Sequence, residues 1–380
     1  MSVETITLGC RLNFAESEAM RASMPADEDW LIVNSCAVTA EAVRQTRQAI
    51  RRARREQPAA KILATGCAVQ LEPESFLAMP EVDRVQTRNF SAPLTIAAGY
   101  LSRVRSFVAV QTGCDHRCTF CTIWQARGPS RSLPFETIRE AVEAQLDKGA
   151  KEIVLTGVDI TSYEGGLGML CQRLLSTVHG LKRLRLSSLD SIEIDDALFE
   201  LIAGERRLMP HFHLSLQAGD DLILKRMKRR HSRADAVRVV ERIKAARPDA
   251  TIGADLIAGF PTETEEMALN SLRLLDDCDV IAAHIFPFSP RPNTPAARMP
   301  QVEREIVKAR AARLREAAAA TRSTWLESLV GTTQRVLIEN NAKGHSDGFA
   351  PVRIDGTTRG ESGKARITGR DGDFLIGVFA

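Results

Sequence analysis

Residues 113–121 read Gly113-Cys114-Asp115-His116-Arg117-Cys118-Thr119-Phe120-Cys121. The three cysteines directly follow an apolar stretch, Phe107–Val110, and they open the longest region of alternating strand and helix patterns in the chain. Three thiolates can hold three irons of a 4Fe-4S cubane and leave the fourth without a protein ligand, whereas an electron-transfer cluster usually takes four cysteines. The C-x3-C-x2-C spacing therefore predicts a cluster with an open iron, typical of a radical enzyme. A zinc knuckle that uses His116 and plain buried thiols are the alternatives.

The composition is that of an ordinary globular protein, and its 380 residues predict two or three domains. No apolar run is long enough for a membrane helix, and the first residues lack the basic and then apolar order of a secretion signal. We therefore expect a cytoplasmic protein without a membrane partner. Eight cysteines in such a chain favour metal binding or catalysis over disulfides, because the cytosol keeps thiols reduced.

Positive charge is concentrated near the amino terminus, although the net charge of the chain is only +3. Residues 42–55 contain six arginines and no acidic residue, and four of the six recur at helical spacing: Arg44, Arg47, Arg51 and Arg55. Such a helix face fits a polyanion. A solvated helix surface is the alternative.

Residues 1–100 are predicted to form a small α/β domain with a parallel sheet. The strand candidates are Glu4–Leu8, Trp30–Asn34 and Lys61–Thr65, and the helix candidates are Glu16–Ala22 and Ala40–Arg55. A cysteine follows each strand, namely Cys10, Cys36 and Cys67. Because ligands gather beyond the carboxyl ends of the strands in open α/β sheets, these three could form a second cluster. Three separate buried cysteines are the alternative.

Residues 104–328 repeat strand and helix patterns six times, which predicts a partial (β/α)6 barrel. The strand candidates are Phe107–Gln111, Glu152–Thr156, Arg183–Leu186, Phe212–Leu216, Thr251–Ile257 and Val280–Phe286. The helix candidates include Pro134–Lys148, Leu167–Val178, Ala234–Ala246, Glu263–Asp276 and the long segment Pro300–Leu329. The working face would be at the strand carboxyl ends. Cys171 and Cys278 fall in helical stretches away from those ends, and we interpret them as core residues.

Residues 329–380 change to a composition rich in Gly, Thr and Arg with short alternating strands, which predicts a small β-barrel. The strand candidates are Gln334–Glu339, Gly348–Ile354, Gly363–Thr368 and Phe374–Phe379. Such barrels often bind nucleic acid. Arg353, Lys364 and Arg366 would supply charge and Phe349 a stacking surface. The alternative is a stabilising cap with ordinary surface charge.

Several motifs resemble those of the methylthiotransferases among the radical S-adenosylmethionine (SAM) enzymes, across nearly the whole chain. In the first domain they are Thr7-Leu8-Gly9-Cys10-Arg11-Leu12-Asn13 with Glu16-Ser17-Glu18, Val33-Asn34-Ser35-Cys36-Ala37-Val38-Thr39, and Thr65-Gly66-Cys67-Ala68-Val69-Gln70. In the barrel they are the Cys114 loop with Arg127-Gly128-Pro129-Ser130-Arg131-Ser132, His213-Leu214-Ser215-Leu216-Gln217-Ala218-Gly219, and Gly253–Pro261. The carboxyl-terminal segment resembles the RNA-binding TRAM barrel. The first-domain phrases look like the branch that modifies N6-threonylcarbamoyladenosine at position 37 of tRNA.

The resemblance implies two 4Fe-4S clusters and SAM as cofactors. One cluster, on Cys114, Cys118 and Cys121, would bind SAM and generate a radical, because carbon 2 of adenine carries an unactivated C–H bond. The other, on Cys10, Cys36 and Cys67, would carry the sulfur. Candidate SAM contacts at the strand ends are Gly157, Asp159, Ser187, Gln217, Asp255 and Gly259, and for each of these a packing or turn role is the alternative. Arg127 and Arg131 could bind the cofactor carboxylate or an RNA phosphate.

The partners expected from the resemblance are the anticodon stem-loop of tRNA and an electron donor such as a flavodoxin or ferredoxin, with the protein itself a monomer. Three alternatives remain open at the level of the sequence. The substrate could be isopentenyladenosine in tRNA, or it could be a ribosomal protein. The chain could also be a zinc-bearing RNA-binding module without catalysis.

Overall fold

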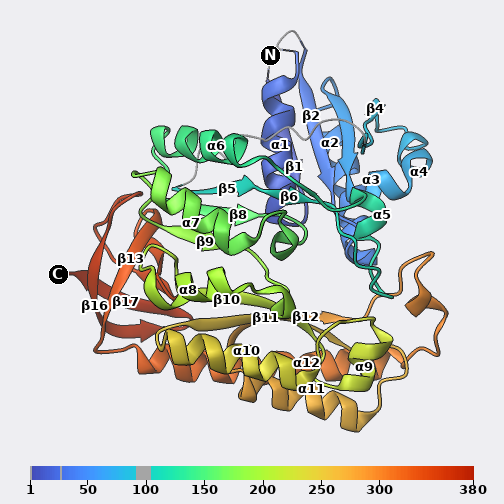
Figure 1. Ribbon diagram of the computed structural model, residues 1–380. Helices are drawn as coiled ribbons and strands as arrows, with labels where there is room; N and C mark the ends of the chain where they lie inside the picture. The colour runs from blue at the N-terminus through green and yellow to red at the C-terminus, as the bar shows by residue number, and fades with distance from the viewer. Residues whose placement is uncertain (1, 26–27, 91–103) are drawn as a thin grey trace.

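The structure is a computed structural model that describes residues 2–25, 28–90 and 104–380 (Figure 1). The predicted end of the first domain, near residue 100, lies outside the described residues. An amino-terminal sheet, a six-stranded central half-barrel and a small closed barrel follow one another along the chain, which confirms the predicted α/β fold class.

The amino-terminal sheet has four parallel strands in the order β1-β2-β3-β4. They are β1 (Val3–Thr7), β2 (Trp30–Ser35), β3 (Lys61–Gly66) and β4 (Arg84–Val85), connected by α1 (Arg11–Ser23), α2 (Ala40–Glu56), α3 (Cys67–Leu71) and α4 (Pro73–Leu77). Helix α1 begins five residues before the predicted Glu16. Its buried side includes the polar Asn13 and Ser17, so a search for an apolar stripe misses its first turn.

The central half-barrel consists of two parallel three-stranded sheets. The first is β5 (Arg105–Ala109), β8 (Glu152–Thr156) and β9 (Leu184–Leu186), and the second is β10 (His211–Gln217), β11 (Thr251–Ala258) and β12 (Val280–Pro287). Isolated parallel bridges, Leu184 to Leu208 and Leu189 to Leu214, join the two sheets. The strands therefore follow the predicted order, with boundaries within a few residues of the prediction.

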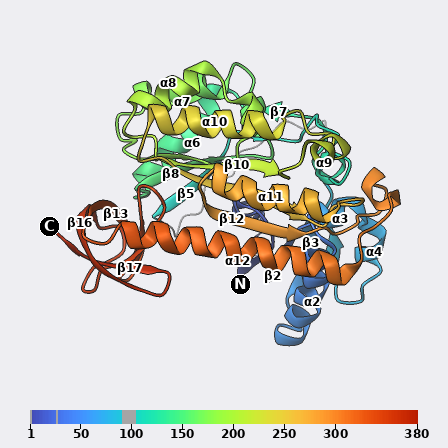
Figure 2. The ribbon, with the colours of Figure 1, turned by 90° about the horizontal axis from the view of Figure 1, so that it is seen from below.

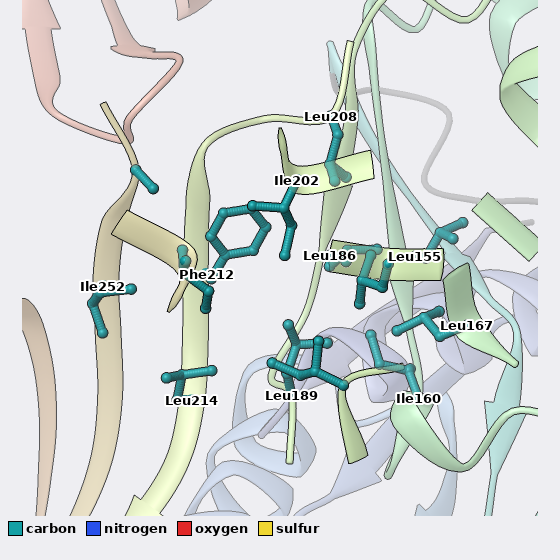
Figure 3. Packing of buried hydrophobic residues seen from close by; sticks show 14 of the residues in the cluster. Leu155, Ile160, Leu167, Leu186, Leu189, Ile202, Leu208, Phe212, Leu214 and Ile252 are labelled. Carbon is teal, nitrogen blue, oxygen red and sulfur yellow. The ribbon is translucent and has the colours of Figure 1, made fainter. Parts of the chain in front are cut away.

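Helices cover the outer face of the half-barrel: α6 (Phe135–Asp147), α7 (Leu167–Thr177), α8 (Asp196–Gly204), α10 (Arg233–Ala246) and α11 (Glu265–Asp277). Short elements occupy the loops, namely β6 (Gln111–Thr112), α5 (Ile123–Arg127), β7 (Arg131–Ser132), the 3-10 turns Ile160–Ser162, Ser191–Glu193 and Pro295–Arg298, and α9 (Asp221–Arg226). The core lies between strands and helices, where Phe212 of β10 lies beside Ile202 of α8 (Figure 3). Burial of each such side chain stabilises the fold by about 1.5–3 kcal/mol. Cys171 and Cys278 are fully buried in this cluster, as predicted.

A 25-residue helix, α12 (Arg304–Ser328), packs against β12 and leads to the carboxyl-terminal barrel (Figure 2). The barrel closes in the order β13-β14-β15-β17-β16, with β13 (Thr333–Asn340), β14 (Lys343–Ser346), β15 (Pro351–Arg353), β16 (Ser362–Asp371) and β17 (Phe374–Phe379). The prediction of a small β-barrel is confirmed. Strand β14 was not predicted, because its sequence Lys-Gly-His-Ser has no apolar alternation.

The small barrel docks on the amino-terminal ends of the central strands through Phe349. The ring stacks on His345 at 4.5 Å and on His211 of β10 at 5.0 Å between centroids, and Arg105 and Arg185 lie 5.1 and 4.8 Å from its centre. The expectation that Phe349 offers a stacking surface to RNA is therefore wrong, because both faces of the ring are used within the protein. Lys364 and Arg366 remain exposed on β16.

Helix α2 does not present a purely cationic face. Arg47 bonds Glu72 and lies over the Phe76 ring, and the carboxylate of Asp83 accepts from Arg54. Arg44, Arg51 and Arg52 also lie within 4 Å of a carboxylate. Glu41 and Glu56 belong to α2 itself, whereas Glu72, Glu81 and Asp83 come from segments after β3 that the local sequence does not reveal. These pairs favour the solvated-surface interpretation of the arginine run. Among the described helices, we find no segment with the length and apolarity that a membrane span requires.

Candidate metal and cofactor site

Cys10, Cys36 and Cys67 lie together beyond the carboxyl ends of β1, β2 and β3. A Cβ atom on Gly9, whose φ is +103°, would lie 2.9 Å from Cys36 Cβ and 3.1 Å from its Sγ, so glycine is required for this close approach. Burial raises the pKa of the Cys36 thiol to about 11, and the nearby thiols of Cys67 and Cys10 act in the same direction. The parallel sheet thus brings together three cysteines that are far apart in the sequence.

Cys114, Cys118 and Cys121 gather in the loop after β6. The loop is tied by Cys121 N, which donates to Cys118 O at 3.1 Å, and by Cys114 N, which donates to Gly128 O at 3.1 Å. Burial raises the pKa of Cys114 to about 12 and of Cys121 to about 11, and the other thiols of the loop contribute to both increases. Three thiols can hold three irons of a 4Fe-4S cluster, and the loading of protonated thiols must release protons.

The two cysteine groups are neighbours. The thiol of Cys67 is one of the causes that raise the pKa of Cys121. Helix α3, which begins at Cys67, packs against α5, which begins two residues after Cys121. A species generated at one group is therefore close to the other.

Arg127 connects the amino-terminal domain to the half-barrel. Its buried guanidinium donates to Asn13 Oδ1 at 2.6 Å and to the two oxygens of Glu16 at 2.8 and 3.1 Å. Arg88 also bonds Glu16, at 2.8 Å, and its Nη1 lies 4.0 Å from Cys67 Sγ. Arg127 is thus engaged within the protein, and the expectation that it binds a cofactor carboxylate or an RNA phosphate is not supported. Its partners Glu16 and Asn13 lie 111 and 114 residues away, beyond the reach of local sequence patterns.

His116 is held by carboxylates. Its Nε2 lies 2.9 Å from Asp159 Oδ2 and 3.7 Å from Glu193 Oε1. The hydrogen bonds to Asp159 and Glu193 raise its pKa to about 10, whereas burial and the positive charge of Arg230, whose Nη2 lies 2.9 Å from the same Nε2, act in the opposite direction. The ligand atoms of Cys114, His116 and Asp159 lie within 4.8 Å of one another, close enough together to surround an ion.

Most candidate SAM contacts lie at or just beyond the carboxyl ends of the strands, but Asp255 lies inside β11, and the two glycines have packing roles. A Cβ on Gly157 would lie 2.8 Å from Gln111 O, and a Cβ on Gly259 would lie 2.5 Å from Val307 Cγ2. The backbone of Asp159 is bonded to the Gln111 side chain. Both glycines are therefore needed for close packing whether or not a cofactor is bound.

The other candidates differ in their surroundings. Asp255 Oδ1 bonds His213 Nε2 at 2.9 Å and His284 Nδ1 at 3.0 Å, and although burial alone would raise the pKa of Asp255, the two imidazoles hold it well below its usual range. Gln217 takes a φ of +67° at the end of β10, where the register shifts. Strained backbone of this kind is common where a side chain is aimed at a ligand. Ser187, at the end of β9, is buried.

Sequence reasoning missed the charged groups around the loop that carries Cys114, Cys118 and Cys121. Arg229 Nη1 lies 3.9 Å from Cys118 Sγ, and its Nη2 donates to Asp190 Oδ2 at 3.0 Å and to Ser215 O at 2.9 Å. Arg230 bonds Glu193 at 2.7 Å. The sequence did offer one signal for Asp190: it closely follows β9, and it therefore belongs to the same rim as Ser187.

Comparison with known proteins agrees with this architecture. Residues 108–275 match the radical SAM superfamily, and residues 2–86 match a family described as uncharacterized protein family UPF0004. A cobalamin-bound radical SAM methyltransferase, TsrM from Kitasatospora setae, aligns with a TM-score of 0.55 at 15% identity over 78% of this chain and 77% of its own. At this identity the likeness shows the fold alone. The fold and the first match define the class of the barrel, that of radical SAM proteins.

Relatives identify the family more narrowly. The chain is 43% identical to the threonylcarbamoyladenosine tRNA methylthiotransferase MtaB of Rickettsia prowazekii, over 93% of this chain and 91% of that protein. The protein of that name from Aquifex aeolicus is 33% identical, over 94% and 97%. The tRNA-2-methylthio-N(6)-dimethylallyladenosine synthase of Maricaulis maris is 30% identical, over 98% and 95%. The chain therefore belongs to the radical SAM methylthiotransferase family.

Proposed function

We propose that this protein transfers a methylthio group to carbon 2 of N6-threonylcarbamoyladenosine at position 37 of tRNA, with two 4Fe-4S clusters and SAM as cofactors. The observation that carries the proposal is the adjacency of two cysteine groups on different domains, one for radical generation and one for sulfur delivery. The relatives named for the threonylcarbamoyl substrate reach 43% identity, against 30% for the dimethylallyl relative described above.

Cys114, Cys118 and Cys121 would hold the radical cluster, and Cys10, Cys36 and Cys67 the auxiliary one. When bound, the radical cluster and SAM supply the one-electron chemistry that an unactivated C–H bond requires. The protein keeps the two groups close to each other. Arg127 and Arg88 place positive charge beside the auxiliary cysteines, and Arg229 does so beside Cys118, where it offsets the negative charge of thiolate ligands.

SAM would lie across the rim of the half-barrel, against Gly157, Asp159, Ser187, Gln217, Asp255 and Gly259. Its amino and carboxylate groups need an acidic and a basic partner, and the rim offers both in Asp190 and Arg229. The six rim contacts are proposed from their position, and the roles of Asp190 and Arg229 from the charges that SAM requires.

The remaining assignments follow from the tRNA substrate. The domains would be 1–100 for the auxiliary cluster, 104–328 for the radical core and 329–380 for RNA binding, with Lys364 and Arg366 facing the anticodon stem-loop. The protein would work in the cytoplasm as a monomer, reduced by a flavodoxin or ferredoxin.

A direct assay tests the function. Anaerobically reconstituted protein is incubated with SAM, a reductant, a sulfide source and an anticodon stem-loop that carries either N6-threonylcarbamoyladenosine or dimethylallyladenosine. We expect mass spectrometry to find the methylthio product with the first RNA and little with the second. A product only with the dimethylallyl RNA, or with neither, would overturn the proposal.

Iron counting tests the cluster assignment. Two cubanes predict about eight irons per chain, and alanine at Cys10, Cys36 and Cys67 should leave about four. Alanine at Cys171 and Cys278, the matched control, should leave about eight, although the core is weakened. A colourless wild-type preparation with stoichiometric zinc would instead support the RNA-binding module.

A further inference from the structure

Arg11, which follows Cys10 at the start of α1, carries a positive charge that nothing nearby neutralises directly. It makes no hydrogen bond or ion pair with any residue in the described part of the chain. The carboxylates whose charge it feels are Glu152 and Glu339, and both are bonded to other groups. Glu152 is shared by three arginines, and Glu339 bonds Arg105 and His345.

The surroundings of Arg11 contain two further cations, Arg105 and Arg185, and an aromatic ring. Its Cζ atom lies 5.6 Å from the centre of the Phe107 ring on β5, the strand against which α1 packs. Arg11 is partly buried, and the positive charges of Arg105 and Arg185 lie near enough to act on it. A cation that is desolvated and repelled in this way is stabilised by a bound anion.

Arg11 also faces the interior of the half-barrel. Its charge is one of the causes that lower the pKa of His211, after burial, Arg185 and His213. His211 and His213 lie on the inner side of β10, because the residues that alternate with them, Phe212 and Leu214, are buried under the outer helices. An anion on Arg11 would therefore lie inside the half-barrel.

We propose that Arg11 binds the carboxylate of the threonyl group of the substrate, and thereby selects N6-threonylcarbamoyladenosine over a base with an apolar N6 substituent. This inference rests on the proposed function. A guanidinium matches a carboxylate with two parallel hydrogen bonds, and a dimethylallyl group offers it nothing. The methionine carboxylate of SAM has the same chemistry, so the test must separate the two sources.

The test measures binding of anticodon stem-loops by fluorescence anisotropy to anaerobically reconstituted protein. Three RNAs differ only at position 37, which carries N6-threonylcarbamoyladenosine, its methyl ester or dimethylallyladenosine. We expect the wild type to bind the free acid about tenfold more tightly than the ester, as for one charge-assisted hydrogen-bonded pair. R11Q should bind acid and ester equally, and R11K should regain part of the difference. R44Q, which changes an exposed arginine paired with Glu41, should match the wild type.

Equal affinity of the wild type for the acid and the ester would overturn the inference. This comparison uses the wild type alone, so it remains valid even if R11Q fails to load its clusters. A loss of SAM affinity in R11Q, measured by equilibrium dialysis, with an unchanged acid-to-ester ratio would assign Arg11 to the cofactor and overturn it as well. If the wild type methylthiolates neither the threonylcarbamoyl RNA nor the dimethylallyl RNA, the proposed function itself is refuted. Methylthiolation of the threonylcarbamoyl RNA without discrimination between acid and ester in binding would refute only the role of Arg11.

Discussion

Replacement of Glu152 by glutamine should destabilise the junction between the half-barrel and the carboxyl-terminal barrel. The carboxylate is fully buried and accepts from Arg105 Nε at 2.5 Å, Arg185 Nε at 2.8 Å and Arg183 Nε at 3.0 Å. Two unit charges about 4 Å apart attract by about 4 kcal/mol at an effective dielectric constant of 20. Repulsion among the three arginines and desolvation of the buried charges offset part of the total attraction. Removal of one partner from a buried pair costs about 3–5 kcal/mol. We expect E152Q to lose about that much.

Urea denaturation followed by tryptophan fluorescence, to which Trp325 beside the carboxyl-terminal barrel contributes, measures this loss. E41Q, which breaks an exposed pair with Arg44, should leave stability unchanged. Burial alone would raise the pKa of Glu152, but the arginines hold it well below its usual range. Its contribution is therefore complete above the unfolded pKa of about 4.3. The difference between wild type and E152Q should be constant from pH 5 to 8. A loss below about 1 kcal/mol, the range of exposed pairs, would refute this reasoning.

Three further changes test other parts of the structure. E16Q removes the carboxylate that two arginines share between domains, and we expect a loss of about 2 kcal/mol at pH 7 in urea titrations. Burial alone would raise the pKa of Glu16, but these arginines lower it to about 2, so the deficit should shrink as pH falls from about 4.3 toward 2, and a pH-independent deficit would contradict this. F349A should lower the free energy of unfolding by about 3 kcal/mol through lost stacking, whereas V378A, at an exposed position, should not. G9A should reduce bound iron from about eight to about four per chain, while G149A, with a similar φ but no neighbour within 4 Å, should leave it unchanged.

The strand order and the positions of both cysteine groups could be predicted from the sequence. Parallel strands buried on both faces read as continuous apolar runs, as in Trp30–Ser35 and Glu152–Thr156, and a cysteine just after a strand must lie at the common edge. The exceptions are elements without such patterns. Strand β4 has only two residues, and the first turn of α1 buries polar side chains.

The pairing of charged side chains could not be predicted in this way. Arg127 bonds Glu16 across 111 residues, and Phe349 stacks on a histidine of β10 that lies in another domain. An arginine near a cluster and a phenylalanine in a small barrel have obvious local interpretations. Tertiary packing determined the actual partners, and these interpretations were wrong for that reason.

Analysis of tRNA nucleosides from a strain that lacks this gene tests the central claim most directly. We predict that 2-methylthio-N6-threonylcarbamoyladenosine disappears, that its precursor without sulfur accumulates, and that the wild-type gene restores the product while a gene with alanine at Cys67 does not. An unchanged content of this nucleoside in the deletion strain would contradict the account.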